Sequence, residues 1–199
     1  MKFFLVILLF ALSVSFAQGP SYILGMRNSK YAYAGIQPFQ SWGIAYENSV
    51  FAQDVELQYG RIALFYVFET TFGFSGSYAF FYGTRYNFDY YDFGAELDLK
   101  YNIHPKYLQI KGVLQPRYDS DAKEMLGYSI LTQTMPLGEV GLFAGFKNLP
   151  EYRDVERRLF AGVAFETPHL KVLPEISTPV ATNLATTRVS ISFVYMNLI

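Results

Sequence analysis

Alternation with a period of two is the feature that most constrains this chain. Between Phe72 and Phe88 the even positions carry mostly aromatic side chains, whereas the odd positions carry mostly Gly, Ser and other small or polar residues. Successive side chains of a β-strand point to opposite faces, so this segment has one aromatic face and one small or polar face. An α-helix would spread both sets around its circumference. The pattern therefore predicts a strand.

The same alternation recurs along most of the chain, in segments of about ten residues that are typical of barrel strands. The apolar phase changes at Gly60 and Arg61, which marks either a tight turn or a β-bulge. A turn there gives twelve strands, whereas a bulge and one further merger give ten. We predict an all-β, closed, antiparallel up-and-down transmembrane β-barrel of twelve strands, with ten as the alternative, and place the strands at 22–37, 41–47, 51–59, 61–69, 72–88, 91–102, 107–118, 125–135, 139–147, 157–166, 169–177 and 187–198.

The links between the predicted strands alternate in length over the C-terminal half of the chain. Barrels of outer membranes have this rhythm, with short turns at one end and longer loops at the other. The short links are 103–106, 136–138 and 167–169, and the longer ones are 119–124, 148–156 and 178–186.

Counting outward from the short links predicts the register of two hairpins. It sets Asp98 opposite Lys111 and Glu166 opposite Lys171, with all four side chains on the inner face. Opposite charges that face each other across two strands contribute roughly 0.2–1 kcal/mol. The register therefore predicts two inward ion pairs.

Composition favours a membrane barrel over a soluble one. Charged residues make up 17% of the chain and aromatic residues 19%, whereas soluble domains have about 25% charged residues. The face opposite the aromatic one is rich in Gly and Ser, as expected where inward side chains compete for space in a narrow lumen. We expect the aromatic face to contact lipid. A secreted soluble β-barrel or sandwich is the alternative.

The N-terminus has the pattern of a secretory signal. Lys2 is followed by an apolar run from Phe3 to Leu12, and Ser15 and Ala17 are small residues at the −3 and −1 positions of a cleavage site. A membrane anchor is the alternative, but a spanning helix needs about 20 apolar residues. We predict that residues 1–17 are removed and that residues 18–199 form the barrel domain.

Taken together, the signal sequence, the aromatic alternation, the even strand number and the link rhythm resemble the small outer-membrane β-barrel proteins of Gram-negative bacteria. The resemblance covers the mature chain as a pattern and not as a motif. It implies a place in the cell outer membrane, contact with outer-membrane lipids and folding by the barrel-assembly machinery. One departure is the C-terminus, since such proteins usually end on an aromatic residue and this chain ends on Ile199.

The inner face of the predicted barrel carries isolated charges of both signs. They indicate either a narrow passive channel for small solutes or a plugged lumen in a structural or surface-interaction barrel. The candidate lumen-lining residues are Arg85, Glu96, Asp98, Lys100, Lys111, Arg117, Glu166, Lys171 and Glu175.

The sequence shows no catalytic centre, and we predict that the protein is not an enzyme. Both histidines, His104 and His169, fall in predicted short turns at one end of the barrel. The chain has no Cys, and Asp119, Asp121 and Glu124 lack the ligand spacing and turn glycine of a calcium loop. No cofactor or metal is expected. A net charge of −1 gives no reason to expect nucleic acid as a partner, and the oligomeric state stays open.

Overall fold

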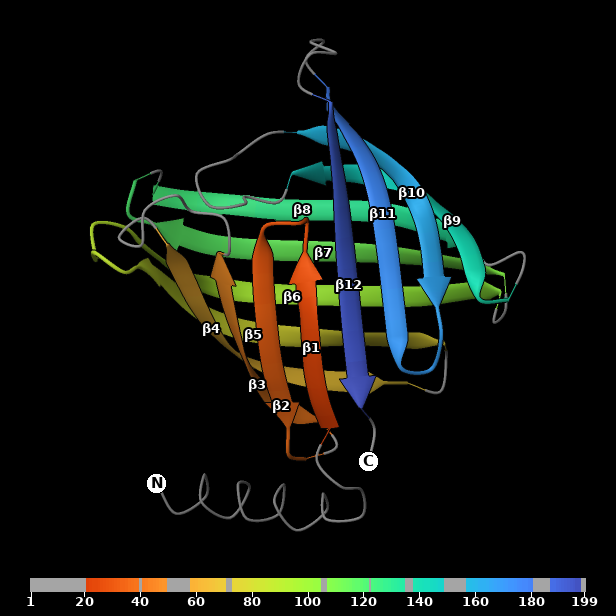
Figure 1. The fold of residues 1–199 in the computed structure, drawn as a ribbon, viewed down its shortest axis with the longest axis horizontal. Helices are drawn as coiled ribbons and strands as arrows, with labels where there is room; N and C mark the ends of the chain where they lie inside the picture. The colour runs from red at the N-terminus through yellow and green to blue at the C-terminus, as the bar shows by residue number, and fades with distance from the viewer. Residues whose placement is uncertain are drawn as a thin grey trace.

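The computed structural model describes residues 21–39, 41–49, 58–70, 73–104, 107–121, 123–134, 138–148, 157–180 and 187–197. Within these ranges the chain forms twelve antiparallel strands in one closed barrel (Figure 1). The strands are β1 (Ser21–Arg27), β2 (Tyr31–Gln37), β3 (Trp42–Ser49), β4 (Tyr59–Glu69), β5 (Phe74–Arg85), β6 (Tyr91–His104), β7 (Leu108–Asp119), β8 (Lys123–Thr134), β9 (Val140–Asn148), β10 (Arg158–Glu166), β11 (Leu170–Pro179) and β12 (Arg188–Asn197).

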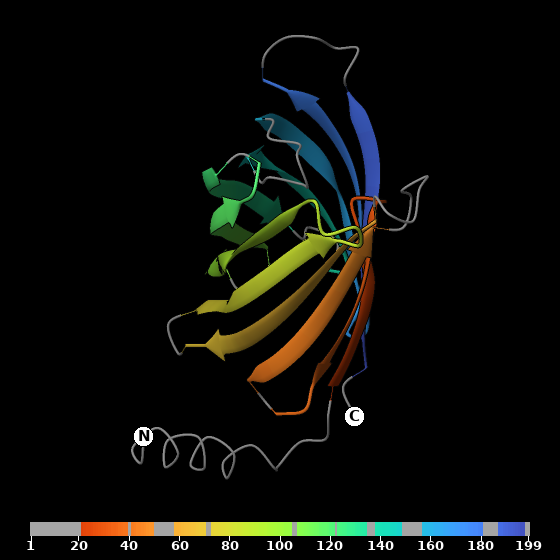
Figure 2. The same cartoon turned by 90° about the vertical axis from the view of Figure 1, so that its left-hand side faces the viewer.

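Each strand pairs with its neighbour in sequence, and the first strand closes the barrel against the last. Tyr22 of β1 lies opposite Asn197 of β12, so the start of β1 and the end of β12 meet at the same end of the barrel (Figure 1 and Figure 2). We call this the terminal end. The opposite end holds the links 28–30, 86–90 and 120–122. The prediction of a closed antiparallel barrel with twelve strands is confirmed, and the ten-strand alternative is wrong.

The predicted single strand 22–37 is in fact two strands. Asn28 and Ser29 adopt positive φ angles of 53° and 55°, and the Lys30 amide donates to the Arg27 carbonyl across the turn at 3.0 Å. Asn tolerates the left-handed conformation better than most residues. No Gly or Pro marks this turn in the sequence. The alternation therefore predicts one continuous strand where the structure has two.

The reverse error concerns Gly60 and Arg61, which form neither a turn nor a bulge. Both lie inside β4, where Gly60 pairs with Thr84 and Arg61 with Gly83 of β5. The apolar phase changes because Tyr59 points into the barrel, where it is 4% exposed. The apolar residues that follow it in β4 point to the outside. The predicted strand 61–69 is therefore part of β4. Most of the predicted strand 51–59 lies outside the described residues.

The predicted register of β6 with β7 is off by two residues. Asp98 lies opposite Val113, and Lys111 lies opposite Lys100. An irregularity between Asn102 and His104 shortens the link and shifts the pairing. Because the shift is an even number of residues, Asp98 and Lys111 remain on the same face. The other predicted pair, Glu166 opposite Lys171, is confirmed.

Two prolines interrupt the pairing of neighbouring strands. The ladder of β7 with β6 is interrupted beside Pro116, and that of β11 with β10 beside Pro174. A Cβ on Gly94 would lie 2.4 Å from the Pro116 carbonyl oxygen, and one on Gly162 would lie 2.2 Å from that of Pro174. Each interruption therefore lies next to a position of the neighbouring strand where only a residue without a side chain fits.

Exposed aromatic side chains form a band at each end of the outer face, and the exposed side chains between the bands are mainly aliphatic. This arrangement matches the aromatic girdles and apolar belt of barrels that span membranes. No helix among the described residues is long and apolar enough to cross a membrane. The terminal-end band contains Tyr22, Phe74, Tyr101, Tyr107, Phe165 and Tyr195, and the opposite-end band contains Tyr46, Tyr82, Tyr86, Tyr91 and Phe93.

Candidate functional site

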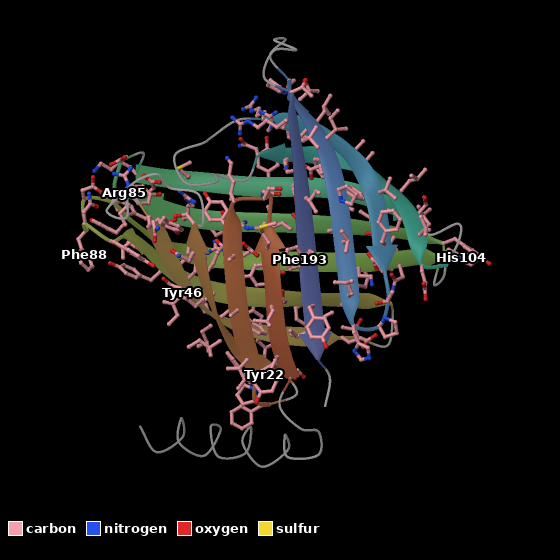
Figure 3. All side chains as sticks on the ribbon, viewed as in Figure 1. Tyr22, Tyr46, Arg85, Phe88, His104 and Phe193 are labelled. Atoms are coloured by element: carbon pink, nitrogen blue, oxygen red, sulfur yellow. The ribbon has the colours of Figure 1, made fainter. Side chains whose placement is uncertain are left out.

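The lumen is lined by every second residue of each strand, and it carries most of the buried polar groups. All nine charged residues predicted from the sequence fall on these inward positions. Figure 3 shows Arg85 at the opposite end and His104 at the terminal end of the same wall. The structure therefore brings the candidate residues into one interior. Their role in passing a solute stays a proposal.

The opposite end of the lumen holds a buried network of charges and tyrosines, which we call the opposite-end network (Tyr59, Tyr90, Asp92, Arg117 and Asp119). Arg117 Nη1 lies 3.3 Å from Asp92 Oδ2, and Arg117 Nη2 lies 2.8 Å from Asp119 Oδ2. Asp92 and Asp119 face each other directly across β6 and β7. Without the guanidinium between them, two buried carboxylates would repel each other at close range.

Two tyrosine hydroxyls complete the opposite-end network. Tyr59 Oη donates to Asp92 Oδ1 at 2.7 Å, and Tyr90 Oη donates to Asp119 Oδ2 at 2.5 Å while it accepts from Arg117 Nη2. Burial raises the pKa of the Tyr90 phenol well above its ordinary value, so the hydroxyl stays protonated and available as a donor. Among the described residues, Asp92 Oδ2 accepts no hydrogen bond and is held by the charge of Arg117. The network fills this part of the lumen.

A second charged group lies nearer to β1–β4. Glu47 is 7% exposed and accepts a hydrogen bond from Arg27 Nη2 at 2.8 Å, and its carboxylate also lies 3.4 Å from Arg61 Nη2. The Arg61 guanidinium lies over the Phe81 ring, 4.9 Å from its centroid. One carboxylate thus holds two guanidiniums, which leaves the group with one net positive charge.

An interior cavity of about 180 Å³ runs along the wall formed by β7–β12 and β1. Its lining includes Gln133 and Lys171 near the terminal end and Asn28 and Lys147 near the opposite end. The full lining is Arg27, Asn28, Lys111, Ser129, Leu131, Gln133, Phe143, Lys147, Phe160, Lys171, Leu173, Glu175 and Ser192.

A second cavity of about 380 Å³ adjoins the first one and shares Arg27, Leu173 and Ser192 with it. Glu47 and Arg61 line it from one side and Glu96 from another. The two cavities therefore lie next to each other in the lumen, beside the filled opposite-end network.

Two further ion pairs lie along the first cavity. Lys147 Nζ lies 2.6 Å from Glu175 Oε1. Lys171 pairs with Glu166, whose Oε1 also accepts from Gln133 Nε2 at 2.7 Å. Among the described residues that line this cavity, Glu175 is the only carboxylate, whereas Arg27, Lys111, Lys147 and Lys171 are cations.

The lumen residues that the sequence analysis missed include Arg27, Glu47 and Lys147. The turn that follows Arg27 was predicted as part of a strand, so the inward position of Arg27 was not recognised. Phe143, Gly145 and Lys147 are every second residue of β9 and share its inner face. The period-two pattern could therefore have identified Lys147 as a lumen residue. Glu47 ended a short predicted strand whose partner strands were misplaced, so its inward position could not be inferred.

The histidines lie where the sequence placed them, at the terminal end. His104 stacks on Tyr107 with ring centroids 4.8 Å apart, and His169 Nδ1 lies 3.3 Å from the Met196 carbonyl oxygen. Of the acidic residues considered for calcium, Asp119 belongs to the opposite-end network. Among the described residues, no group of three or more Asp, Glu or His is arranged to hold a metal ion.

Solved structures of outer-membrane porins share this fold. The KdgM porin, in a complex with disordered oligogalacturonate, matches with a TM-score of 0.62 and 13% identity, over 88% of this chain and 97% of that chain. The NanC porin matches with a TM-score of 0.52 and 8% identity, over 91% and 100%. An outer-membrane phospholipase of Salmonella typhi matches with a TM-score of 0.43 and 11% identity, over 92% and 93%.

No protein-family model and no curated protein matches the sequence. The expected likeness to small outer-membrane β-barrel proteins is confirmed at the level of the fold, which this chain shares with the two porins. At these identities the likeness concerns the fold alone.

Proposed function

We propose that this protein is an outer-membrane channel through which small polar solutes diffuse. One observation carries the proposal: the lining of the 180 Å³ cavity includes residues near both ends of the barrel, Lys171 at one and Lys147 at the other. A lumen filled by side chains at every level would not leave such a cavity. The fold shared with two porins supports the same function.

The two aromatic bands support a place in a membrane, with the aliphatic belt between them facing acyl chains. We propose export, removal of residues 1–17 and assembly of residues 18–199 in the outer membrane of a Gram-negative cell, with outer-membrane lipids and the barrel-assembly machinery as partners. N-terminal sequencing of the membrane-bound form should begin at Gln18. A membrane-bound form that retains Met1 would contradict export by this signal.

The charges of the cavity favour solutes that carry negative charge. Two of the carboxylates that pair with lining cations, Glu47 and Glu166, do not line the 180 Å³ cavity themselves. A passing solute therefore meets more ammonium and guanidinium groups than carboxylates. The KdgM porin was solved in complex with oligogalacturonate, an anionic ligand, and we propose anionic solutes as the preferred class here.

A structural barrel with a plugged lumen is the second candidate function. The opposite-end network favours it, because Tyr90, Asp92 and Asp119 are at most 1% exposed and fill part of the interior. The two functions differ in one measurable property, which is whether ions cross the folded barrel.

Conductance of the purified, refolded protein in a planar bilayer tests the proposal. We expect discrete conductance steps and, under a KCl gradient, a reversal potential that reports a preference for chloride over potassium. The fold is verified on the same sample by the mobility change on boiling that detergent-resistant barrels show. Folded protein that inserts and gives no steps would favour the plugged structural barrel.

A further inference from the structure

The side chains of Lys100 and Lys111 face each other directly across β6 and β7. Directly opposed residues on one face of two strands have Cβ atoms about 4.5–5.5 Å apart, and like charges in this position are destabilising. The two-residue shift of the register creates this contact, since the expected register would have set Lys111 opposite a carboxylate. A negative charge bound beside them would offset the repulsion between two ammonium groups placed together inside a barrel.

Other inward cations of this barrel have partners. Arg117 contacts two carboxylates, Arg27 and Arg61 share one, and Lys147 and Lys171 each have one. Within the part of the chain that the structure describes, no ion pair joins Lys100 or Lys111 to a carboxylate. This lysine pair is thus unlike the remaining charged groups of the lumen.

A third cation reaches the same place from the other wall. Lys171 of β11 lines the 180 Å³ cavity together with Lys111 and lies close enough for the two ammonium groups to interact. Lys100 is another electrostatic neighbour of Lys111. Ser129 and Gln133 line the same cavity and add a hydroxyl and an amide. The region therefore gathers Lys111, Lys171 and neutral hydrogen-bond donors around an open space, and Lys100 adds a third ammonium group opposite Lys111.

The carboxylates nearby do not neutralise the three lysines. Glu166 pairs with Lys171 and is also an electrostatic neighbour of Lys111. Asp98 lies diagonally from Lys111 and interacts electrostatically with all three lysines. Two carboxylates beside three lysines leave one positive charge without an offset.

We propose that Lys100, Lys111 and Lys171 form a binding site for one small oxyanion, such as phosphate, in the terminal half of the lumen. The lysines supply the charge, and Ser129 and Gln133 donate hydrogen bonds. The site goes beyond the channel function, since an anion can be held there whether or not solutes cross the barrel. An ion at this position relieves the repulsion between Lys100 and Lys111 and stabilises the folded barrel by linkage.

Isothermal titration of the refolded barrel with inorganic phosphate, in detergent and a chloride-free buffer, tests the site. We expect one phosphate per barrel and a higher unfolding temperature in phosphate than in glucose, an uncharged control. Lys111→Gln should weaken binding roughly tenfold or more, as expected for loss of a charged hydrogen-bond donor. Lys111→Arg should retain most of the binding because it keeps the charge.

Lys123→Gln is the matched control, since it removes the same charge from an exposed residue at the opposite end. It should leave phosphate binding unchanged. Absence of phosphate binding by the wild-type barrel would overturn the site, and so would equal weakening by Lys111→Gln and Lys123→Gln in folded samples. Conductance is measured separately, so a barrel that conducts without binding phosphate refutes the site alone. A barrel that binds phosphate without conducting refutes the channel alone.

Discussion

At the opposite end of the lumen, Arg117 lies between two buried carboxylates and two tyrosines close the network. In the terminal half, Lys100 faces Lys111 with no ion pair, beside an open cavity. Both regions occupy the inner face of the same strands, β6 and β7. In the opposite-end network, the paired charges and the two tyrosines fill the lumen. In the terminal half, the lysines lie beside a cavity that a solute can occupy.

Removing Arg117, the cation at the centre of the opposite-end network, should have the largest effect on the unfolding free energy of the barrel. Arg117→Met leaves Asp92 and Asp119 buried and facing each other, and loss of one partner from a buried charge network costs about 3–5 kcal/mol. Urea unfolding of the barrel in lipid vesicles should show a loss of this size. Adding Asp119→Asn to Arg117→Met should recover part of it. An unfolding free energy that does not change would mean that the network does not hold this end together.

The next largest effect should separate the lipid face from the lumen. Leu97 belongs to the outward set of β6, where an Arg near the bilayer centre costs about 2–4 kcal/mol. Glu96 faces the lumen, where its carboxylate accepts from Gln115, and a new Arg there rearranges ion pairs. Leu97→Arg should therefore unfold at much lower urea than Glu96→Arg. Equal destabilisation by both variants would contradict the assigned faces.

A smaller effect is expected at Glu175, the carboxylate of the cavity lining. Glu175→Gln leaves Lys147 unpaired and facing the cavity. One unit charge acting at 4 Å through water contributes about 1 kcal/mol, a factor of about five in the local anion concentration. Reversal potentials under a KCl gradient should shift towards stronger chloride preference. A shift towards potassium would show that the cavity does not set the selectivity.

The smallest effect belongs to the ion pair between Arg85 and Asp89. Asp89 has a side chain 48% exposed, so water offsets most of what the pair contributes. Asp89→Asn should change the unfolding free energy by less than about 1 kcal/mol. A larger loss would show that the ion pair of Arg85 with Asp89 supports the opposite-end network.

The sequence predicted the fold best where outward apolar residues and inward small or polar residues alternate most regularly, as in β5 and β6. It failed where one residue broke the pattern for a local reason. The turn at Asn28 and Ser29 has no Gly or Pro, and Tyr59 is an aromatic residue that points inward. The two errors offset each other, so the strand number came out right although 22–37 merged two strands and 51–59 was counted as an additional one.

The lumen was predictable only as a set of inward positions. Alternation identifies Arg117 and Lys111 as inward, but it cannot tell that one is enclosed by carboxylates and the other faces Lys100. That difference depends on the register of β6 with β7 and on side chains that reach across the lumen, such as Lys171. Both depend on the closed barrel and not on any local segment.

Ser129→Cys tests the central claim most directly, because Ser129 lines the cavity and the chain has no cysteine of its own. Thr132→Cys on the same strand is the matched control, since its side chain is on the outer face and exposed. A bulky charged thiol reagent added to the conducting barrel should remove most of the conductance of Ser129→Cys and leave that of Thr132→Cys unchanged. Unchanged conductance in fully labelled Ser129→Cys would contradict a path through this cavity.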